Sequence, residues 1–138
     1  MAKHLNKNSS PIPTRNEERS LMKRGYSLIA GLDEVGRGPL AGPVVAGIAV
    51  LPHDLDGEWV SLIRDSKQMT RAKRNYVLPH LEEKALALEV GICSNEEIDR
   101  MGIVAATQLS MKRALNSIPL LPQFLLLDAI TLPGIPIP

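Results

Sequence analysis

Two short apolar segments joined by a glycine- and proline-rich turn constrain the fold of this chain more than any other feature. The first, SLIAGLDE (residues 27–34), leads into GRGPLAGP (36–43), and the second, VVAGIAVL (44–51), stops at Pro52. Short apolar runs with a Gly/Pro connection are typical of neighbouring antiparallel strands. We therefore expect a sheet that begins with this pair.

The segments that follow predict a helix and a third strand. Residues 52–68 form a polar loop, after which Thr70 is an expected N-cap for a helix from about Arg71 to Glu83. Pro79 falls inside that helix, where it predicts a kink or an early end. The stretch ALALEVGICS (85–94) alternates and predicts a third strand.

A longer helical stretch and a fourth strand complete the pattern. Ser94-Asn95-Glu96-Glu97 is a capping-box start for a helix reaching about Ser117, with Gly102 as a point of division. The segment QFLLLDAI (123–130) is apolar throughout, which predicts a strand covered on both faces. The order of elements indicates an α/β fold with a mixed sheet flanked by helices. The residues that recur at helical spacing along this stretch are Ile98, Met101, Ala105, Leu109 and Lys112.

Composition excludes several classes of function. Aromatic residues make up only 3% of the 138 residues, too few for a platform that stacks single-stranded bases. The net charge of +1 excludes a bulk polycation, so any phosphate-binding surface must come from local clustering. The single cysteine, Cys93, excludes an internal disulfide and a multi-thiolate zinc site, and its apolar surroundings predict a buried thiol.

Residues 1–24 differ from the rest, which predicts a polar basic leader followed by one domain over residues 25–138. The leader holds six basic residues against two acids, and Glu17 to Arg24 predicts a helical turn or two. It is expected either to solubilise the chain or to contact nucleic-acid phosphate. It lacks the apolar core of a secretory signal, and no run is long enough to span a bilayer, so we expect a cytoplasmic protein without a membrane partner.

Three acids stand where predicted strands end. Asp33 and Glu34 close the first strand, and Asp128 follows Leu125-Leu126-Leu127 in the fourth. If these strands are neighbours, their C-terminal ends bring the carboxylates together, with the turn after Val35 directing Asp33 and Glu34 to one point. All-oxygen ligation selects Mg²⁺ or Mn²⁺ over zinc. The alternatives are ordinary surface charge for the acidic pair and a strand-end cap for Asp128.

Glycines and basic residues near the acids indicate a phosphate- or sugar-binding role. Gly36-Arg37-Gly38 directly follows the acids, and glycine lets backbone amides approach a ligand closely; a tight turn explains the same residues. Lys67 begins a basic patch that continues with Arg71, Lys73 and Arg74. This patch is expected either to grip duplex phosphates or to be a solvated helix face. The histidines His4, His53 and His80 have no ligand spacing and are assigned no role.

Together these segments resemble ribonuclease HII, a prokaryotic family of the ribonuclease H-like superfamily. The similar stretches are LIAGLDEVGRGPLAGPVVAGIAVL, DSKQMT, VGICSNEEIDRMGIVAATQLSMKRAL and LLLDAITLP, in the family's order. The resemblance implies Asp33, Glu34 and Asp128 as catalytic ligands of Mn²⁺ or Mg²⁺. It implies Gly36, Arg37 and Gly38 as the loop that reads the ribose 2′-hydroxyl, and Lys67 as a contact to substrate phosphate.

The implied activity is endonucleolytic hydrolysis of the RNA strand of RNA–DNA hybrids, and at single ribonucleotides embedded in DNA. The implied products carry 5′-phosphate and 3′-hydroxyl ends, and the implied full-length protein is a monomer. Two departures are a fourth acid and later helices that the family places beyond the position of Pro138, so a ribonuclease H-like domain with its C-terminal part missing is expected. The alternative is an impaired fragment that binds hybrid duplex and metal without cutting. A mononucleotide phosphate loop at residues 36–42 is disfavoured because the Lys-Ser/Thr ending of a P-loop is absent.

Overall fold

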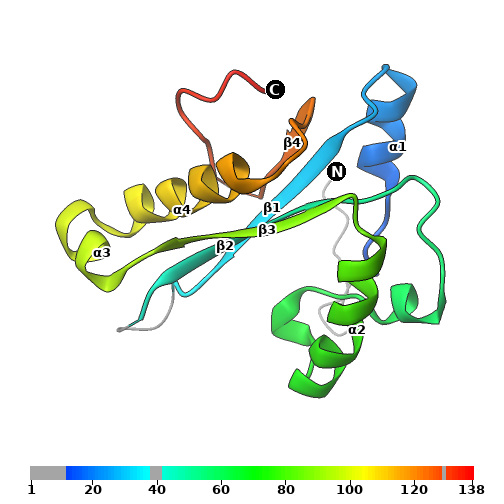
Figure 1. Cartoon of the computed structure of the whole chain (residues 1–138), viewed down its shortest axis with the longest axis horizontal. Helices are drawn as coiled ribbons and strands as arrows, with labels where there is room; N and C mark the ends of the chain where they lie inside the picture. Colours follow the sequence, from blue (N-terminus) through cyan, green and yellow to red (C-terminus); the bar gives the residue numbers. More distant parts are fainter. Residues whose placement is uncertain (1–11, 38–41, 129) are drawn as a thin grey trace, which may run out of the picture.

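The computed structural model describes residues 12–37, 42–128 and 130–138 of the chain. Its centre is a four-stranded sheet in the order β3-β2-β1-β4 (Figure 1). Strands β1 (Ile29–Val35), β2 (Val44–Val50) and β3 (Ala87–Cys93) are antiparallel neighbours, whereas β4 (Phe124–Leu126) is parallel to β1. The predicted mixed sheet and its opening antiparallel pair are confirmed.

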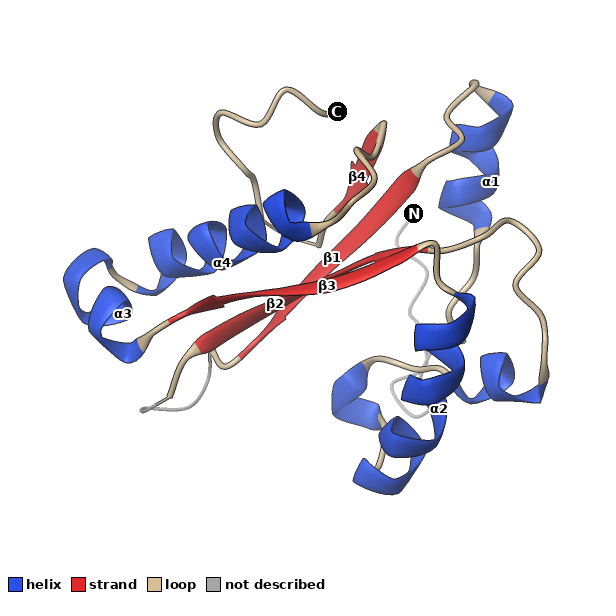
Figure 2. Ribbon diagram, in the orientation of Figure 1, coloured by secondary structure: helices blue, strands red, loops and turns tan. Residues whose placement is uncertain are grey.

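Helices lie on both sides of this sheet (Figure 2). The long α4 (Ile103–Ser117), preceded by the short α3 (Asn95–Met101), packs against β3 and β2. On the other side, α2 (Arg71–Lys84) lies with the 3₁₀ turns η1 (Glu58–Leu62) and η2 (Ser66–Gln68), and α1 (Asn16–Lys23) precedes β1. No helix in the ranges given above is long and apolar enough to cross a bilayer.

The hydrophobic core lies between α4 and one face of the sheet, which we call the covered face. Strands β1 and β2 alternate here, with Ala30, Leu32, Ala46, Ile48 and Val50 buried. The helix supplies Met111, Ala114 and Leu115, and Leu125 of β4 completes the cluster. Gly91 of β3 allows the close approach, because a Cβ there would collide with the backbone of Ser110 and Ala114.

Local signals place the helix ends where they were predicted. The hydroxyl of Thr70 accepts a hydrogen bond from the backbone N–H of Lys73 at 3.2 Å. Ser94 and Glu97 form the expected capping box, and Gly102 separates α3 from α4 with a φ of 84°. The helix α2 passes through Pro79 and continues to Lys84, so the proline does not end it early.

The residues that recur at helical spacing in the sequence do not form the buried face of the long helix. Met101 is 39% exposed, and Ala105, Leu109 and Lys112 are only half-buried. The side chains that pack on the sheet include small and hydroxyl residues, because Gly91 brings the helix backbone close. The hydroxyls of Thr107 and Ser110 are satisfied by helix carbonyls, which removes the cost of burying them. The buried residues of α4 are Ala106, Thr107, Ser110, Met111, Ala114 and Leu115.

The fourth strand is shorter and less covered than predicted. It spans only Phe124–Leu126 at an edge of the sheet, and Leu125 is its one buried residue. The prediction of a strand covered on both faces is therefore wrong, since apolar sequence alone does not distinguish a central strand from an edge strand. The backbone N–H of Leu125 donates to the carbonyl of Pro138 at 2.8 Å, so the C-terminal residues lie along this strand.

The described part of the predicted leader includes a helix that is held against the domain. Leu21 of α1 is buried at 5% exposure. Arg15, just before this helix, donates to the carbonyl of Pro52 at 2.7 Å and pairs with Glu18 at 3.3 Å. The expected turn or two of helix is confirmed, and this segment is packed rather than detached.

Candidate active site

A cavity of about 870 Å³ lies on the sheet face opposite α4, which we call the cavity face. Strand alternation turns Gly31 and Asp33 of β1 toward this face, together with Gly47 and Ala49 of β2. Because these side chains are short, they do not fill the space between the sheet and α2. Leu78 of α2 lines the opposite side of that space. The cavity is a consequence of these short side chains.

Two of the three predicted metal ligands line this cavity. β4 pairs with β1 so that Gly31 lies opposite Leu126, and Asp33 and Asp128 each follow that pair by two residues. Both residues are exposed and both line the cavity. One oxygen of Asp33 also accepts the backbone N–H of Glu34 at 2.9 Å, which fixes the direction of its carboxylate.

Glu34 is directed away from this pair. The expectation that a turn brings Asp33 and Glu34 to one point is not met, because β1 continues through Val35 and adjacent strand residues face opposite sides. The register partner of Glu34 is Ala46, which is fully buried on the covered face. Its carboxylate lies 3.6 Å from Arg37 Nη1, with 19% of the side chain exposed.

Among the described residues, no three His, Cys, Asp or Glu side chains come together closely enough to hold a metal ion by themselves. Asp33 and Asp128 nevertheless offer the oxygen ligands that a hard cation prefers. Magnesium in proteins is often held by one or two carboxylates, with water and substrate phosphate completing the shell. The residues present therefore fit a divalent cation shared between the protein and a phosphate-bearing substrate.

The sequence left two explanations for Gly36-Arg37-Gly38, a ligand-binding loop and a tight turn, and they apply to different residues. Gly36 has a φ of 95°, and a Cβ there would collide with the carbonyl oxygen of Pro43, so the tight-turn explanation accounts for this glycine. Arg37 is 42% exposed at its side chain and lies beside Glu34, which offsets the negative charge next to Asp33. Gly38 lies outside the described residues, and its predicted role stays a prediction.

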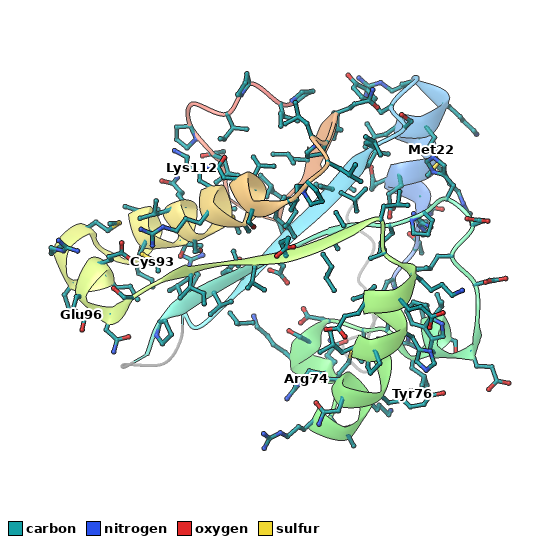
Figure 3. All side chains as sticks on the ribbon, viewed as in Figure 1. Met22, Arg74, Tyr76, Cys93, Glu96 and Lys112 are labelled. Carbon is teal, nitrogen blue, oxygen red and sulfur yellow. The ribbon has the colours of Figure 1, made fainter. Side chains whose placement is uncertain are left out.

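The predicted phosphate-binding lysine lies on a structured turn. Asp65 caps η2 by accepting the backbone N–H of Lys67 at 3.0 Å. The side chain of Lys67 is exposed and forms no ion pair within residues 12–37, 42–128 and 130–138. Arg74, at the start of α2 beside this turn (Figure 3), donates to two backbone carbonyls instead of standing free.

Sequence reasoning missed three further acids of the cavity and one aromatic cluster. Glu17 of α1, Glu82 of α2 and Glu89 of β3 also line the cavity. Leu78 and Glu82 are four residues apart in α2, so their spacing could have predicted that Glu82 lies on the same helix face as Leu78. No sequence pattern predicted that Glu17 lines the cavity. The imidazole of His80 stacks on Trp59 at 5.6 Å and meets Tyr76 edge-on at 5.1 Å, which joins η1 to α2.

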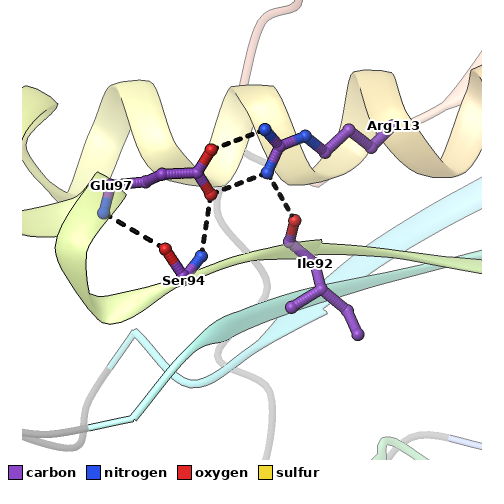
Figure 4. A network of polar contacts seen from close by, with 4 residues as sticks. All are labelled: Ile92, Ser94, Glu97 and Arg113. Atoms are coloured by element: carbon purple, nitrogen blue, oxygen red, sulfur yellow. Dashed lines mark hydrogen bonds and ion pairs between the residues drawn. The ribbon is translucent and has the colours of Figure 1, made fainter.

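The shortest ion pair among the described residues joins Arg113 to Glu97, neither of which lines the cavity. Figure 4 draws its contacts. Arg113 of α4 donates twice to the carboxylate of Glu97, at 2.7 and 2.6 Å, and once to the carbonyl of Ile92 at 2.7 Å. These bonds, with the Ser94 N–H, hold the pKa of Glu97 far below its usual range. Burial raises the pKa of the neighbouring Cys93 thiol, which is fully buried as predicted.

Comparison with known proteins identifies the family. Residues 30–135 match the family model described as Ribonuclease HII. A protein named Ribonuclease HII from Dehalococcoides mccartyi strain BAV1 is 52% identical over 126 residues, or 91% of this chain. The crystal structure of the ribonuclease H2 from Pyrococcus horikoshii OT3 matches 73% of this chain at 31% identity, with a TM-score of 0.61.

A more distant structure, Bst-RNase HIII in complex with Mn²⁺, shares the fold at a TM-score of 0.58 over 94% of this chain, at 20% identity. The chain spans 59% of the length of the Dehalococcoides relative, 49% of the Pyrococcus chain and 44% of the Bst-RNase HIII chain. Family match, sequence identity and fold agree over most of the residues. This chain belongs to the ribonuclease HII family.

Proposed function

We propose that this chain is an endoribonuclease that hydrolyses the RNA strand of RNA–DNA hybrids, and single ribonucleotides embedded in DNA, in the cytoplasm. The proposed products carry 5′-phosphate and 3′-hydroxyl ends. The observation that carries the proposal is that Asp33 and Asp128, from neighbouring parallel strands, line one cavity. Family membership supports it independently.

The proposed cofactor is Mn²⁺ or Mg²⁺, held by Asp33 and Asp128 together with a substrate phosphate. Held there, a divalent ion would supply an activated water and would offset the charge on the leaving 3′ oxygen. The oxygen-only donor set supports a hard cation, and the related fold of Bst-RNase HIII has been solved with Mn²⁺. The protein's own part is to orient the scissile phosphate between these carboxylates.

The remaining residues are proposed to select and hold the substrate. Arg37 and its flanking glycines, Gly36 and Gly38, are proposed to contact the ribose 2′-hydroxyl, the group that distinguishes RNA from DNA. Glu34 orients the guanidinium of Arg37 from 3.6 Å. The exposed ammonium of Lys67 is proposed to meet a backbone phosphate, which contributes affinity without sequence preference.

The test is cleavage of a duplex with one embedded ribonucleotide by the parent chain and by Asp33→Asn, with Mn²⁺ and with Mg²⁺. The amide keeps the size of the side chain and removes the ligand charge, so turnover should fall about 100-fold or more while duplex binding changes little. Glu82→Gln is the matched control, because it removes a carboxylate from the same cavity without touching the proposed ligand pair. Equal turnover by parent and Asp33→Asn would refute the assignment.

A second candidate function, binding of hybrid duplex without cleavage, is favoured by the direction of Glu34. With its carboxylate engaged by Arg37, only two predicted ligands reach the cavity. Two carboxylates hold a divalent cation more weakly than three, so catalysis is the first property to be lost. Tight binding of hybrid duplex by the parent chain, with no cleavage at high Mn²⁺, would select this function over the first.

A further inference from the structure

The basic residues around η2 fall into two groups that the sequence does not separate. The guanidinium groups of Arg64 and Arg74 donate hydrogen bonds to backbone carbonyls of the protein. Arg64 Nη1 donates to the carbonyls of Ser61 and Ile63. The side chains of Lys67, Arg71 and Lys73 are exposed, and none forms a hydrogen bond or ion pair in the described portion of the chain. Within the described residues, the charged groups of the second set therefore have no partner in the protein itself.

The contacts of Arg74 converge on the turn that carries Lys67. Its Nη1 donates to the carbonyl of Ser66 at 3.1 Å and to that of Met69 at 2.9 Å. These two carbonyls bracket Lys67 on either side. The other hydrogen bonds of the turn come from its own residues. Asp65 accepts the N–H groups of Lys67 (at its carboxylate) and Gln68 (at its carbonyl), at 3.0 and 2.8 Å, and the Ser66 carbonyl accepts the N–H of Met69 at 3.3 Å. A three-residue 3₁₀ turn has weak hydrogen bonds of its own, so the planar guanidinium is a large part of its support.

We propose that Arg74 is a positioning residue that holds the Ser66–Met69 turn and thereby presents the Lys67 ammonium to a backbone phosphate. This inference rests on the proposed function, because the phosphate belongs to the hybrid duplex. A turn fixed before binding spares the complex the entropic cost of ordering it, so the clamp raises affinity through Lys67. The competing assignment is that Arg74 contacts phosphate itself through its remaining N–H groups.

A double-mutant cycle separates the two assignments. Binding of an RNA–DNA hybrid duplex is measured without divalent cations for parent, Lys67→Ala, Arg74→Ala and the double variant. Each single variant should weaken binding, and Lys67→Ala should lower the slope of log affinity against log salt by about 1. In the Lys67→Ala background, Arg74→Ala should change affinity little, a coupling of about threefold or more. Additive effects would overturn the proposal.

Conservative and control variants sharpen the result. Arg74→Lys keeps the charge but not the planar donors that reach two carbonyls, so it should bind as weakly as Arg74→Ala; binding equal to the parent would overturn the clamp. Arg71→Ala, on the same helix, should be additive with Lys67→Ala, because its side chain makes no hydrogen bond to the turn. Asp65→Ala loosens the turn from the other side and should couple to Lys67 as Arg74→Ala does.

A readout without nucleic acid tests the clamp alone. Hydrogen exchange of the Lys67, Gln68 and Met69 amides should become faster in Arg74→Ala, while amides of β2 and α4 keep their protection. Unchanged exchange in the turn would overturn the proposal even if the double-mutant cycle showed coupling between Lys67 and Arg74. A parent chain that does not bind hybrid duplex refutes the proposed function and this inference together, whereas a binding parent with an additive cycle refutes the inference alone.

Discussion

Both faces of the sheet carry glycine and alanine, but the small residues have opposite effects on the two faces. On the covered face, α4 lies so close to Gly91 that an added Cβ there would collide with the helix backbone. On the cavity face, Gly31 and Gly47 have nothing within 4 Å of where a Cβ would stand, and the space above them is the cavity that holds Asp33. Small side chains give tight packing where a helix lies against them, and a binding space where none does.

This difference suggests that the covered face contributes most of the fold's stability and that the cavity face binds the ligand. Residues whose exposure is 1% or less lie between α4 and the sheet, including Val44, Ile48 and Met111. The cavity face carries Val90 at 56% exposure and Leu78 at 47%. Substitutions on the covered face should therefore act through unfolding, whereas those on the cavity face should act through ligand binding. Such a division is testable with matched pairs.

The largest expected effect is the truncation of Met111 to alanine. The side chain is 1% exposed at the centre of the core, so Met111→Ala should lower the free energy of unfolding by about 3 kcal/mol. The partner variant, Val90→Ala, shortens an exposed side chain on the cavity face and should cost less than about 1 kcal/mol. Urea denaturation monitored by circular dichroism measures both. Similar losses for the two variants would break the division between the faces.

Glycine substitutions give the next largest effect, with opposite outcomes on the two faces. Gly91→Ala places a methyl group against the backbone of α4, which cannot yield by a rotamer change, so we expect a loss of about 2 kcal/mol. Gly47→Ala meets nothing within 4 Å and reduces the freedom of the unfolded chain, so stability should stay equal or rise by about 0.5 kcal/mol.

Thermal unfolding of the two glycine variants beside the parent provides the measurement. Gly31→Ala serves as a second variant on the cavity face, since its added methyl group also meets open space. A destabilising Gly47→Ala or a neutral Gly91→Ala would contradict the difference between the two faces.

Much of the fold was predictable because its signals are local. The N-cap at Thr70, the capping box at Ser94 and the break at Gly102 each depend on residues within one helical turn. The antiparallel start of the sheet followed from two strands and their connection. The buried stripe of α4 was not predictable in this way, because the face that packs depends on Gly91, which lies on a different element.

The candidate site was predictable only as far as strand order allowed. Placing Asp128 near Asp33 required only that β1 and β4 be parallel neighbours, and this holds. The side on which Glu34 lies depended on whether β1 ends before or after Val35, a difference of one residue that reverses a side chain's face. The roles of Arg71 and Arg74 were indistinguishable in sequence, since their difference is which of them reaches the carbonyls of the η2 turn.

The smallest expected effect is electrostatic and depends on pH. Glu97 has a folded-state pKa lowered first by the hydrogen bonds from Arg113 and then by that from the Ser94 N–H. A lowered pKa stabilises the fold at pH values above the unfolded value of about 4.3, and this contribution is lost as the pH falls toward the folded value. Glu97→Gln lacks the charge, so it should unfold at a lower temperature than the parent at pH 7, and the difference should shrink below about pH 4.

Glu96→Gln is the matched control, because Glu96 is the neighbouring acid of the same helix turn and forms no ion pair in the ranges the structure describes. It should follow the pH profile of the parent. The Arg113–Glu97 ion pair joins α3, α4 and the edge of β3. Among residues 12–37, 42–128 and 130–138, Asp33 and Asp128 form no ion pair. If Glu97→Gln and Glu96→Gln lose stability in parallel from pH 7 to pH 3, the network adds nothing beyond surface charge. The covered face would then depend on packing alone.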